Sequence, residues 1–275
     1  MRFFFVMLIL NFSGCANPMV SIKPKIDEFK HEHSSQIHIF KGTRSQMRYA
    51  ESGNSQMRPL VFVHGSPGSW EGWSEFLLNT ELQKNFHLIA IDRPGYGGSA
   101  PGRTETSLAL QAEDVIEVLQ FNHSSLPAIL VGHSYGGPLV VQMAIEFPKQ
   151  VSGLVIVAGS VDPEQEITKW YQTLASWWPL RIMIPNSLRV CNEEIMALKP
   201  ELEKLEWSKI RAPVYIIQGN DDPLVPPANV DYMIRKLPPH LLLKAVRENN
   251  LNHFVPWKRP DLILDGITNV ANAIH

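Results

Sequence analysis

Apolar positions along this chain fall into short continuous runs, and several runs are followed by a segment with helical spacing. Within 106–120, for example, Leu108, Ala112, Val115 and Ile116 recur at helical intervals with polar residues between them, which is typical of an amphipathic helix. The runs are rich in Val, Ile and Leu without alternation, as expected for strands buried on both faces. The pattern predicts strands at 60–64, 87–91, 129–131, 151–158, 214–217 and 241–246, and helices at 73–83, 106–120 and 137–147.

The alternation of strands and helices predicts an α/β fold with a doubly wound, mostly parallel sheet. Two short alternating segments, 36–40 and 46–50, predict a hairpin ahead of it. Between residues 159 and 212 the alternation stops, and a stretch with several tryptophans takes its place. We expect its prolines, Pro179, Pro185 and Pro200, to break the helices there.

Composition narrows the functional classes. The 275 residues fit one large domain, and 25 basic against 27 acidic residues, well mixed, give no nucleic-acid surface. No residues have the spacing of a metal site, so we expect neither a metal nor a cofactor. The sequence does not define an oligomeric state.

The first fifteen residues have the pattern of a targeting segment. A basic Arg2 precedes an apolar run over 3–10, which is too short to span a bilayer, since spanning takes about 20 apolar residues. The following Phe12-Ser13-Gly14-Cys15 resembles the bacterial lipobox, except that Phe12 stands where an aliphatic residue is usual. This resemblance implies a lipid on Cys15 and cleavage before it. The alternatives are an ordinary secretion signal or a misassigned start.

Residues 16–35 have no clear period and predict a tether between this anchor and the domain. With Cys15 lipidated, Cys191 is the one cysteine left, so no intramolecular disulfide can form. Ala16 follows the lipidation site where an Asp would retain the protein at the inner membrane. We therefore expect a membrane-anchored lipoprotein of the cell envelope, facing the periplasm and favouring the outer membrane, with secretion as the alternative.

The stretch Gly132-His133-Ser134-Tyr135-Gly136 lies between a predicted strand and a predicted helix. This is the context of a nucleophile elbow, in which a serine is held on a strained turn above the sheet edge. The two glycines remove Cβ atoms that would clash with the neighbouring strand and helix. The amide of Tyr135, at the helix N-terminus, would face a developing oxyanion.

Two more polar loops follow predicted strands in the order that a Ser-Asp-His triad requires. Asp222 lies in a loop after strand 214–217, and His253 in a loop after strand 241–246. Earlier in the chain, His-Gly-Ser-Pro-Gly at 64–68 and Asp-Arg-Pro-Gly-Tyr-Gly-Gly-Ser at 92–99 form Gly- and Pro-rich turns after strands.

From about residue 37 to 274 these motifs, in this order, resemble the α/β-hydrolase superfamily. The resemblance implies a hydrolase domain over 36–275 with a short helical lid at about 160–212, inserted after the sixth strand. It implies catalysis by Ser134, Asp222 and His253, with oxyanion amides at Ser66 and Tyr135. It does not name a substrate, because many activities share this scaffold.

Alternatives exist for two positions. Asp221 and Asp162 compete with Asp222 as the acid, although we expect the first to cap its loop and the second to shape a turn. His64, His133 and His240 compete with His253, but the first two lie inside tight loops and His240 follows Pro239 near the surface.

The lid carries Trp170, Trp177 and Trp178. They can line an apolar substrate pocket, or they can anchor the lid to the core by burying their large area. Both hypotheses stay open.

The sequence thus predicts a serine hydrolase that cleaves a small ester or related acyl substrate through an acyl-enzyme. A C–C bond hydrolase or aminopeptidase of the same fold is one alternative, and a non-catalytic, membrane-tethered binding protein is another. A serine nucleophile is unlike the dehalogenases and epoxide hydrolases of this superfamily, whose nucleophile is a carboxylate.

Overall fold

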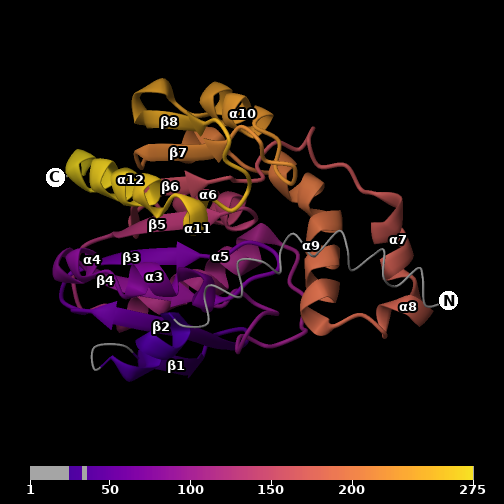
Figure 1. The fold of residues 1–275 in the computed structure, drawn as a ribbon, viewed down its shortest axis with the longest axis horizontal. Helices are drawn as coiled ribbons and strands as arrows, with labels where there is room; N and C mark the ends of the chain where they lie inside the picture. The colour runs from indigo at the N-terminus through magenta and orange to yellow at the C-terminus, as the bar shows by residue number, and fades with distance from the viewer. Residues whose placement is uncertain (1–24, 33–35, 275) are drawn as a thin grey trace.

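The computed structural model describes residues 25–32 and 36–274. They form one eight-stranded sheet in the order β1-β2-β4-β3-β5-β6-β7-β8 (Figure 1). The strands are β1 (Gln36–Lys41), β2 (Gln46–Gly53), β3 (Arg58–Val63), β4 (Phe86–Ile91), β5 (Ala128–His133), β6 (Val151–Val157), β7 (Val214–Gly219) and β8 (Leu242–Glu248).

Strands β3 to β8 pair in parallel, while β1 and β2 form an antiparallel hairpin that joins the sheet at β4. The predicted hairpin, the doubly wound sheet and its strands are confirmed, with ends that differ by up to three residues. Parallel strands bring their carboxyl ends to one edge of the sheet, which is where the loops of the site begin.

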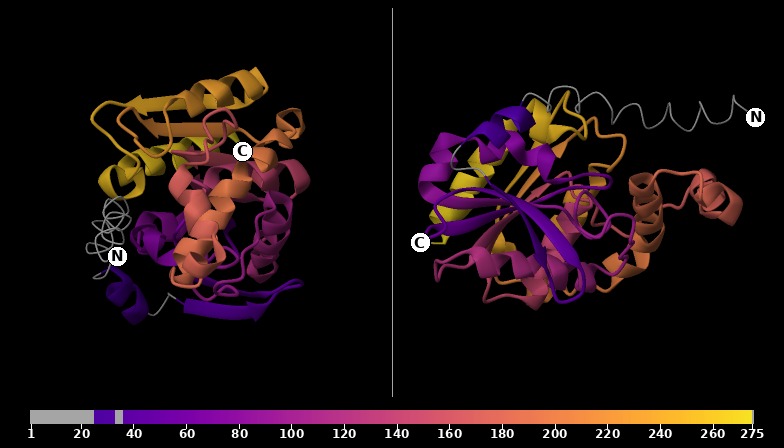
Figure 2. Two further views of the ribbon diagram at one scale, coloured as in Figure 1. Left: turned by 90° about the vertical axis from the view of Figure 1, so that its right-hand side faces the viewer. Right: turned by 90° about the horizontal axis from the view of Figure 1, so that it is seen from below.

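Successive residues of the strands pack into two separate cores, one on each face. On β3, Val61 and Val63 belong to the core under α5, α6 and α10, whereas Leu60 and Phe62 belong to the core under α12 and the helical segments that follow β3 (Figure 2). The helices outside the lid are η2 (Trp70–Trp73), α3 (Ser74–Leu77), α4 (Thr80–Asn85), α5 (Leu108–Ile116), η3 (Glu117–Phe121), α6 (Gly136–Glu146), α10 (Ala228–Lys236), η5 (Pro239–Leu241), α11 (Val255–Lys258) and α12 (Pro260–Ala273).

The helix predicted at 73–83 is in fact three short pieces, η2, α3 and α4. The break comes at Asn79, whose side chain accepts hydrogen bonds from the amides of Glu81 and Leu82 and so starts a new helix. Similarly, the helix predicted at 106–120 ends as α5 at Ile116 and continues as the 3₁₀ segment η3.

The lid consists of α7 (Trp170–Ser176), α8 (Trp178–Arg181), α9 (Asn186–Glu203) and η4 (Trp207–Lys209), between β6 and β7 as predicted. The expectation that Pro200 breaks a helix is wrong, because α9 runs through it. Leu198 and Leu202, on either side, are buried in the core, and their packing offsets the cost of about 3 kcal/mol of an interior proline. Figure 1 shows α7 and α8 beyond α9, on the side away from the sheet.

Part of the segment expected to be a tether packs against the domain. Residues 25–31 are helical, and the fully buried Phe29 has its ring centre 5.1 Å from that of Trp70. The predicted signal segment 1–15, its Cys15 and residues 16–24 lie outside the described residues. Among the helices that the structure describes, none combines the length and the apolar character that crossing a bilayer requires.

Candidate active site

Ser134 lies on a strained turn between β5 and α6. Its φ is +56°, in the left-handed region that non-glycine residues rarely adopt. A Cβ on Gly132 would lie 2.3 Å from the carbonyl oxygen of Gly136, and a Cβ on Gly136 would lie 2.3 Å from that of Val63. Both distances are clashes, so the turn needs glycine on each side of the serine, as the sequence predicted.

The His-Gly turn after β3 lies directly against this elbow. A Cβ on Gly65 would be 2.7 Å from the Cβ of Ser134 and 3.2 Å from its hydroxyl oxygen. The backbone of Gly65 therefore lies close to Ser134, and Ser66 is the next residue along the chain. Tyr135, on the other side, is the N-cap of α6, where the first amides of a helix have no partner within it.

Asp222 and His253, from different loops, form a buried pair. The Nδ1 atom of His253 lies 2.7 Å from Oδ2 of Asp222, and both side chains are buried. The other carboxylate oxygen accepts hydrogen bonds from the amides of Leu224 and Val225, each at 2.9 Å. Burial alone would raise the pKa of Asp222, but His253 and these amides outweigh it and lower the pKa.

This pairing determines which nitrogen of the imidazole can act as a base. With Asp222 ionised, Nδ1 carries the proton that it donates to the carboxylate, and Nε2 is left as the acceptor. The backbone carbonyl of His253 is also held, since Nε2 of His133 lies 3.0 Å from it. The residue before Ser134 thus contacts the loop of His253.

The competing carboxylates are placed differently. Asp221 has an exposed side chain. Asp162 is buried, but its carboxylate accepts the amide of Glu164 at 3.0 Å, in the turn-shaping arrangement expected for it.

The competing histidines are engaged within loops. Nε2 of His64 accepts the amide of Arg93 at 3.0 Å, and burial lowers the pKa of His64 well below its usual value. Burial, followed by the nearby His253, lowers the pKa of His133 to about 3. The rings of His133 and His253 have centres 4.7 Å apart. Both buried histidines are therefore neutral at physiological pH.

A buried ion pair that the sequence analysis missed lies behind the His-Gly turn. Arg93 and Glu194 both have fully buried side chains. Two nitrogens of the guanidinium lie 2.6 and 3.1 Å from the carboxylate oxygens. Burial disfavours the charge of Arg93, but Glu194 outweighs this effect and raises its pKa, so the guanidinium remains charged.

The guanidinium also holds the turn in place. It donates to the backbone carbonyls of His64 and Gly65, at 2.9 and 3.1 Å, and to the hydroxyl of Ser66 at 2.6 Å. The Ser66 hydroxyl itself hydrogen-bonds Glu194. Because Glu194 belongs to α9, the lid is connected to the turn through a buried polar network.

No local signal could have revealed this pair. Arg93 lies in the turn motif at 92–99, which predicted loop shape, and Glu194 is an ordinary glutamate within a lid helix 101 positions later. Only the fold brings them together.

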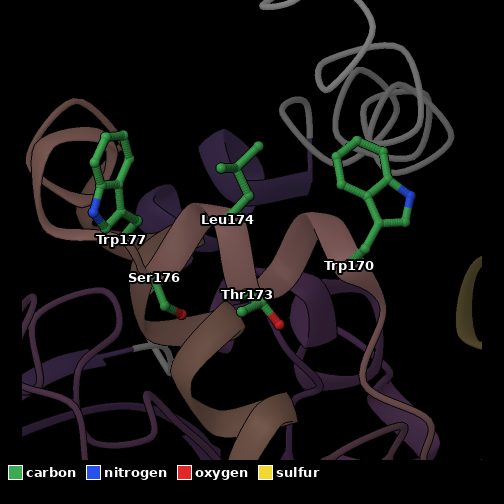
Figure 3. Close-up of a pocket in the computed structure, with 5 residues that line it drawn as sticks. All are labelled: Trp170, Thr173, Leu174, Ser176 and Trp177. Atoms are coloured by element: carbon green, nitrogen blue, oxygen red, sulfur yellow. The ribbon is translucent and has the colours of Figure 1, made fainter.

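Three of the lid's tryptophans, Trp170, Trp177 and Trp178, lie at the surface and are exposed by 70%, 61% and 71%. Trp170, Thr173, Leu174, Ser176 and Trp177 line an open groove on α7 (Figure 3), and none of Ser134, Asp222 and His253 is part of its lining. The structure therefore does not bring these tryptophans together with the candidate triad. Because these side chains are exposed, the second hypothesis, that they anchor the lid by burial against the core, is wrong as well.

Within the described residues, no three metal-ligating side chains gather in a way that could hold an ion.

Comparison with known proteins agrees with the fold. Residues 58–182 match the family model described as alpha/beta hydrolase fold. The chain is 26% identical to epoxide hydrolase 3 of Mus musculus, over 64% of this chain and 51% of that protein. It is 31% identical to a 2-hydroxy-6-oxononadienedioate/2-hydroxy-6-oxononatrienedioate hydrolase of Paraburkholderia phymatum, over 43% of this chain and 41% of that protein. The aligned part of this chain thus covers about half of the length of the first relative and less than half of the second.

A crystal structure of a bacterial membrane phospholipase A superposes over 100% of this chain and 99% of its own, with a TM-score of 0.69 and 19% identity. At this identity the likeness concerns the fold alone. The chain therefore has the α/β-hydrolase fold, and its residues 58–182 match the family model of that fold.

Proposed function

We propose that this protein is a serine hydrolase that cleaves a small ester or related acyl compound through an acyl-enzyme. The observation that carries the proposal is the buried pair of His253 and Asp222, 2.7 Å apart, beside a strained serine elbow. A carboxylate that orients an imidazole next to a half-buried serine turn has a direct use in nucleophilic catalysis.

In the first step, Nε2 of His253 takes the proton of the Ser134 hydroxyl as its oxygen attacks the acyl carbon. Asp222 stabilises the imidazolium that forms and keeps its own charge. His253 then gives the proton to the leaving group, and the acyl group remains on Ser134. In the second step, water repeats the attack with the same histidine as base, releasing the acid and the free serine.

The oxyanion of each tetrahedral intermediate would accept hydrogen bonds from the amides of Ser66 and Tyr135. The geometric support is the contact between Gly65 and Ser134, because it keeps the amide after Gly65 on the side of the nucleophile. Arg93 and Glu194 fix the conformation of that turn from behind, and such preorganised donors are the main source of electrostatic catalysis.

A hydrolase of a carbon–carbon bond is the second candidate, favoured by the similarity to the Paraburkholderia hydrolase. Epoxide hydrolysis is less consistent with this chain, despite the mouse relative. The elbow carries Ser134, whereas the epoxide hydrolases of this superfamily use a carboxylate there.

The test is labelling with a fluorophosphonate probe together with turnover of p-nitrophenyl esters of increasing chain length. We expect the wild-type protein to be labelled and to hydrolyse short esters, and Ser134→Ala to lose both. Ser160→Ala is the matched control, since this serine lies beside the elbow, with its amide 3.3 Å from the carbonyl of Ser134. An unlabelled wild-type protein, or a Ser134→Ala variant that retains turnover, would contradict the proposal.

We further propose that Cys15 carries a lipid that anchors the protein in the cell envelope, facing the periplasm. The support is the short apolar run followed by Ser13-Gly14-Cys15. An ordinary secretion signal is the alternative.

A further inference from the structure

The outer part of the lid exposes large apolar side chains. Of the thirteen large hydrophobic residues exposed in the described part of the chain, seven lie between residues 167 and 183. We call five of these, Leu174, Trp177, Trp178, Ile182 and Met183, the lid-tip patch. A concentration of this kind usually marks an interaction surface.

The polar side of helix α7 packs against the rest of the protein. Asn192 of α9 donates to the hydroxyl of Ser176 at 2.9 Å and to the carbonyl of Gln172 at 3.0 Å. Figure 3 shows Leu174 and Trp177 on the opposite side of the helix from Ser176. This orientation is the reverse of a helix that packs on a core, where the apolar side faces inward.

Basic side chains near the lid-tip patch outnumber acidic ones by three to two when Glu166 and Glu193, which flank the segment, are counted. Residues 167–192 contain Lys169, Arg181 and Arg189 and no aspartate or glutamate. Arg181 and Arg189 share one carboxylate, that of Glu193, at 2.7 and 3.3 Å. The segment therefore keeps a net positive charge, which complements an anionic surface.

Tryptophan and isoleucine beside basic residues are the combination with which amphipathic segments lie in the interface of a bilayer. We propose that the lid-tip patch docks on an anionic lipid bilayer. Trp177, Trp178 and Ile182 enter the headgroup region, and the neighbouring basic side chains meet anionic lipid. This docking does not depend on the hydrolase chemistry.

The experiment measures cosedimentation of the full chain with vesicles of phosphatidylcholine and phosphatidylserine. A Cys15→Ser background removes the predicted lipid site, and the apolar run at 3–10 is present in every variant compared. In this background we expect Trp177→Ser with Trp178→Ser to lower vesicle partitioning by ~10-fold or more, because two large apolar side chains no longer insert. Vesicles without phosphatidylserine should bind the unsubstituted patch more weakly.

The matched control is Ile39→Ser, on β1 at the edge of the sheet and well apart from α7 (Figure 1), since Ile39 is also 62% exposed. It should partition like its parent. Equal partitioning of the patch variant and its parent would overturn the proposal. So would a patch variant that loses self-association in sedimentation velocity while vesicle binding is unchanged, because the patch would then cover a second copy. Ester turnover, measured separately without lipid, reports on the proposed function alone.

Discussion

Replacing Glu194 by alanine tests the buried ion pair most directly. The substitution leaves the guanidinium of Arg93 fully buried. Its remaining acceptors are the carbonyls of His64 and Gly65, the hydroxyl of Ser66 and the amide oxygen of Gln111. None of these carries a negative charge. Leaving a buried charge without its partner typically costs about 3–5 kcal/mol of the free energy of unfolding.

For a domain of this size, each kcal/mol corresponds to about 2–4 °C in Tm, so we expect Tm to fall by about 6–20 °C. The measurement is thermal unfolding followed by circular dichroism, with urea unfolding for the free energy. The control is the double variant Arg93→Met with Glu194→Leu, which removes both charges and fills their volume. Such replacements are often neutral in stability, so most of the loss should be recovered.

The same variants separate stability from catalysis. The double variant should fold well. Its His-Gly turn should nevertheless be less rigid, because Arg93 no longer binds the carbonyls of His64 and Gly65. We expect its kcat for an ester to fall, by at most the 10²–10³-fold that loss of one oxyanion donor costs, with little change in KM. A loss below about 1 kcal/mol in Glu194→Ala, or full kcat in the double variant, would refute this reasoning.

Three further predictions follow from the site and the N-terminus. Asp222→Asn should lower kcat by up to about 10⁴-fold through the wrong imidazole tautomer, whereas Asp221→Asn and Asp162→Asn should retain most turnover; a larger loss in either of these would reassign the acid. His133, with a pKa of about 3 in the fold and about 6.5 when unfolded, binds its proton only on unfolding, so stability is lost as pH falls below about 6.5. Urea unfolding should show a loss of about 1.4 kcal/mol from this group between pH 7.5 and 5.5, and His133→Gln should lack it; an unchanged pH slope would show that the histidine is not buried neutral. Cys15→Ser should abolish lipid labelling and shift the protein to the soluble fraction, and unchanged lipid labelling would argue against the lipobox.

The sheet could be predicted because its strands are short and uninterrupted apolar runs. In β3 and β4 nearly every residue is buried, so the sequence pattern and the packing coincide. The elbow could also be predicted. Gly132 is required by a clash with Gly136, four residues away, and Gly136 by a clash with Val63 on the neighbouring strand β3. The apolar runs and Gly132 have local causes, whereas Gly136 was predicted from the motif and its cause lies in the neighbouring strand.

The lid was less predictable because its orientation depends on distant contacts. Helical spacing groups Leu174 and Trp177 on one side of α7, but the spacing cannot say whether that side faces the protein or solvent. The answer depends on Asn192, which binds the polar side. The burial of Phe29 could not be predicted either, because a single apolar residue in a polar segment has no periodicity that would indicate a buried face.

Helix α9 connects the two features that the sequence did not reveal. Through Glu194 it is bound to the turn behind the elbow by a buried, charge-assisted network. Through Asn192 it holds α7 by a few neutral hydrogen bonds, and through Glu193 it holds α8 by a partly exposed ion pair with Arg181, of a kind that contributes at most about 1 kcal/mol. A neutral hydrogen bond contributes about 1 kcal/mol, whereas breaking the buried pair costs several times more. The lid therefore has a fixed base and a weakly held tip. A displacement of α7 and α8 would therefore break weaker contacts than a displacement of the turn behind Ser134.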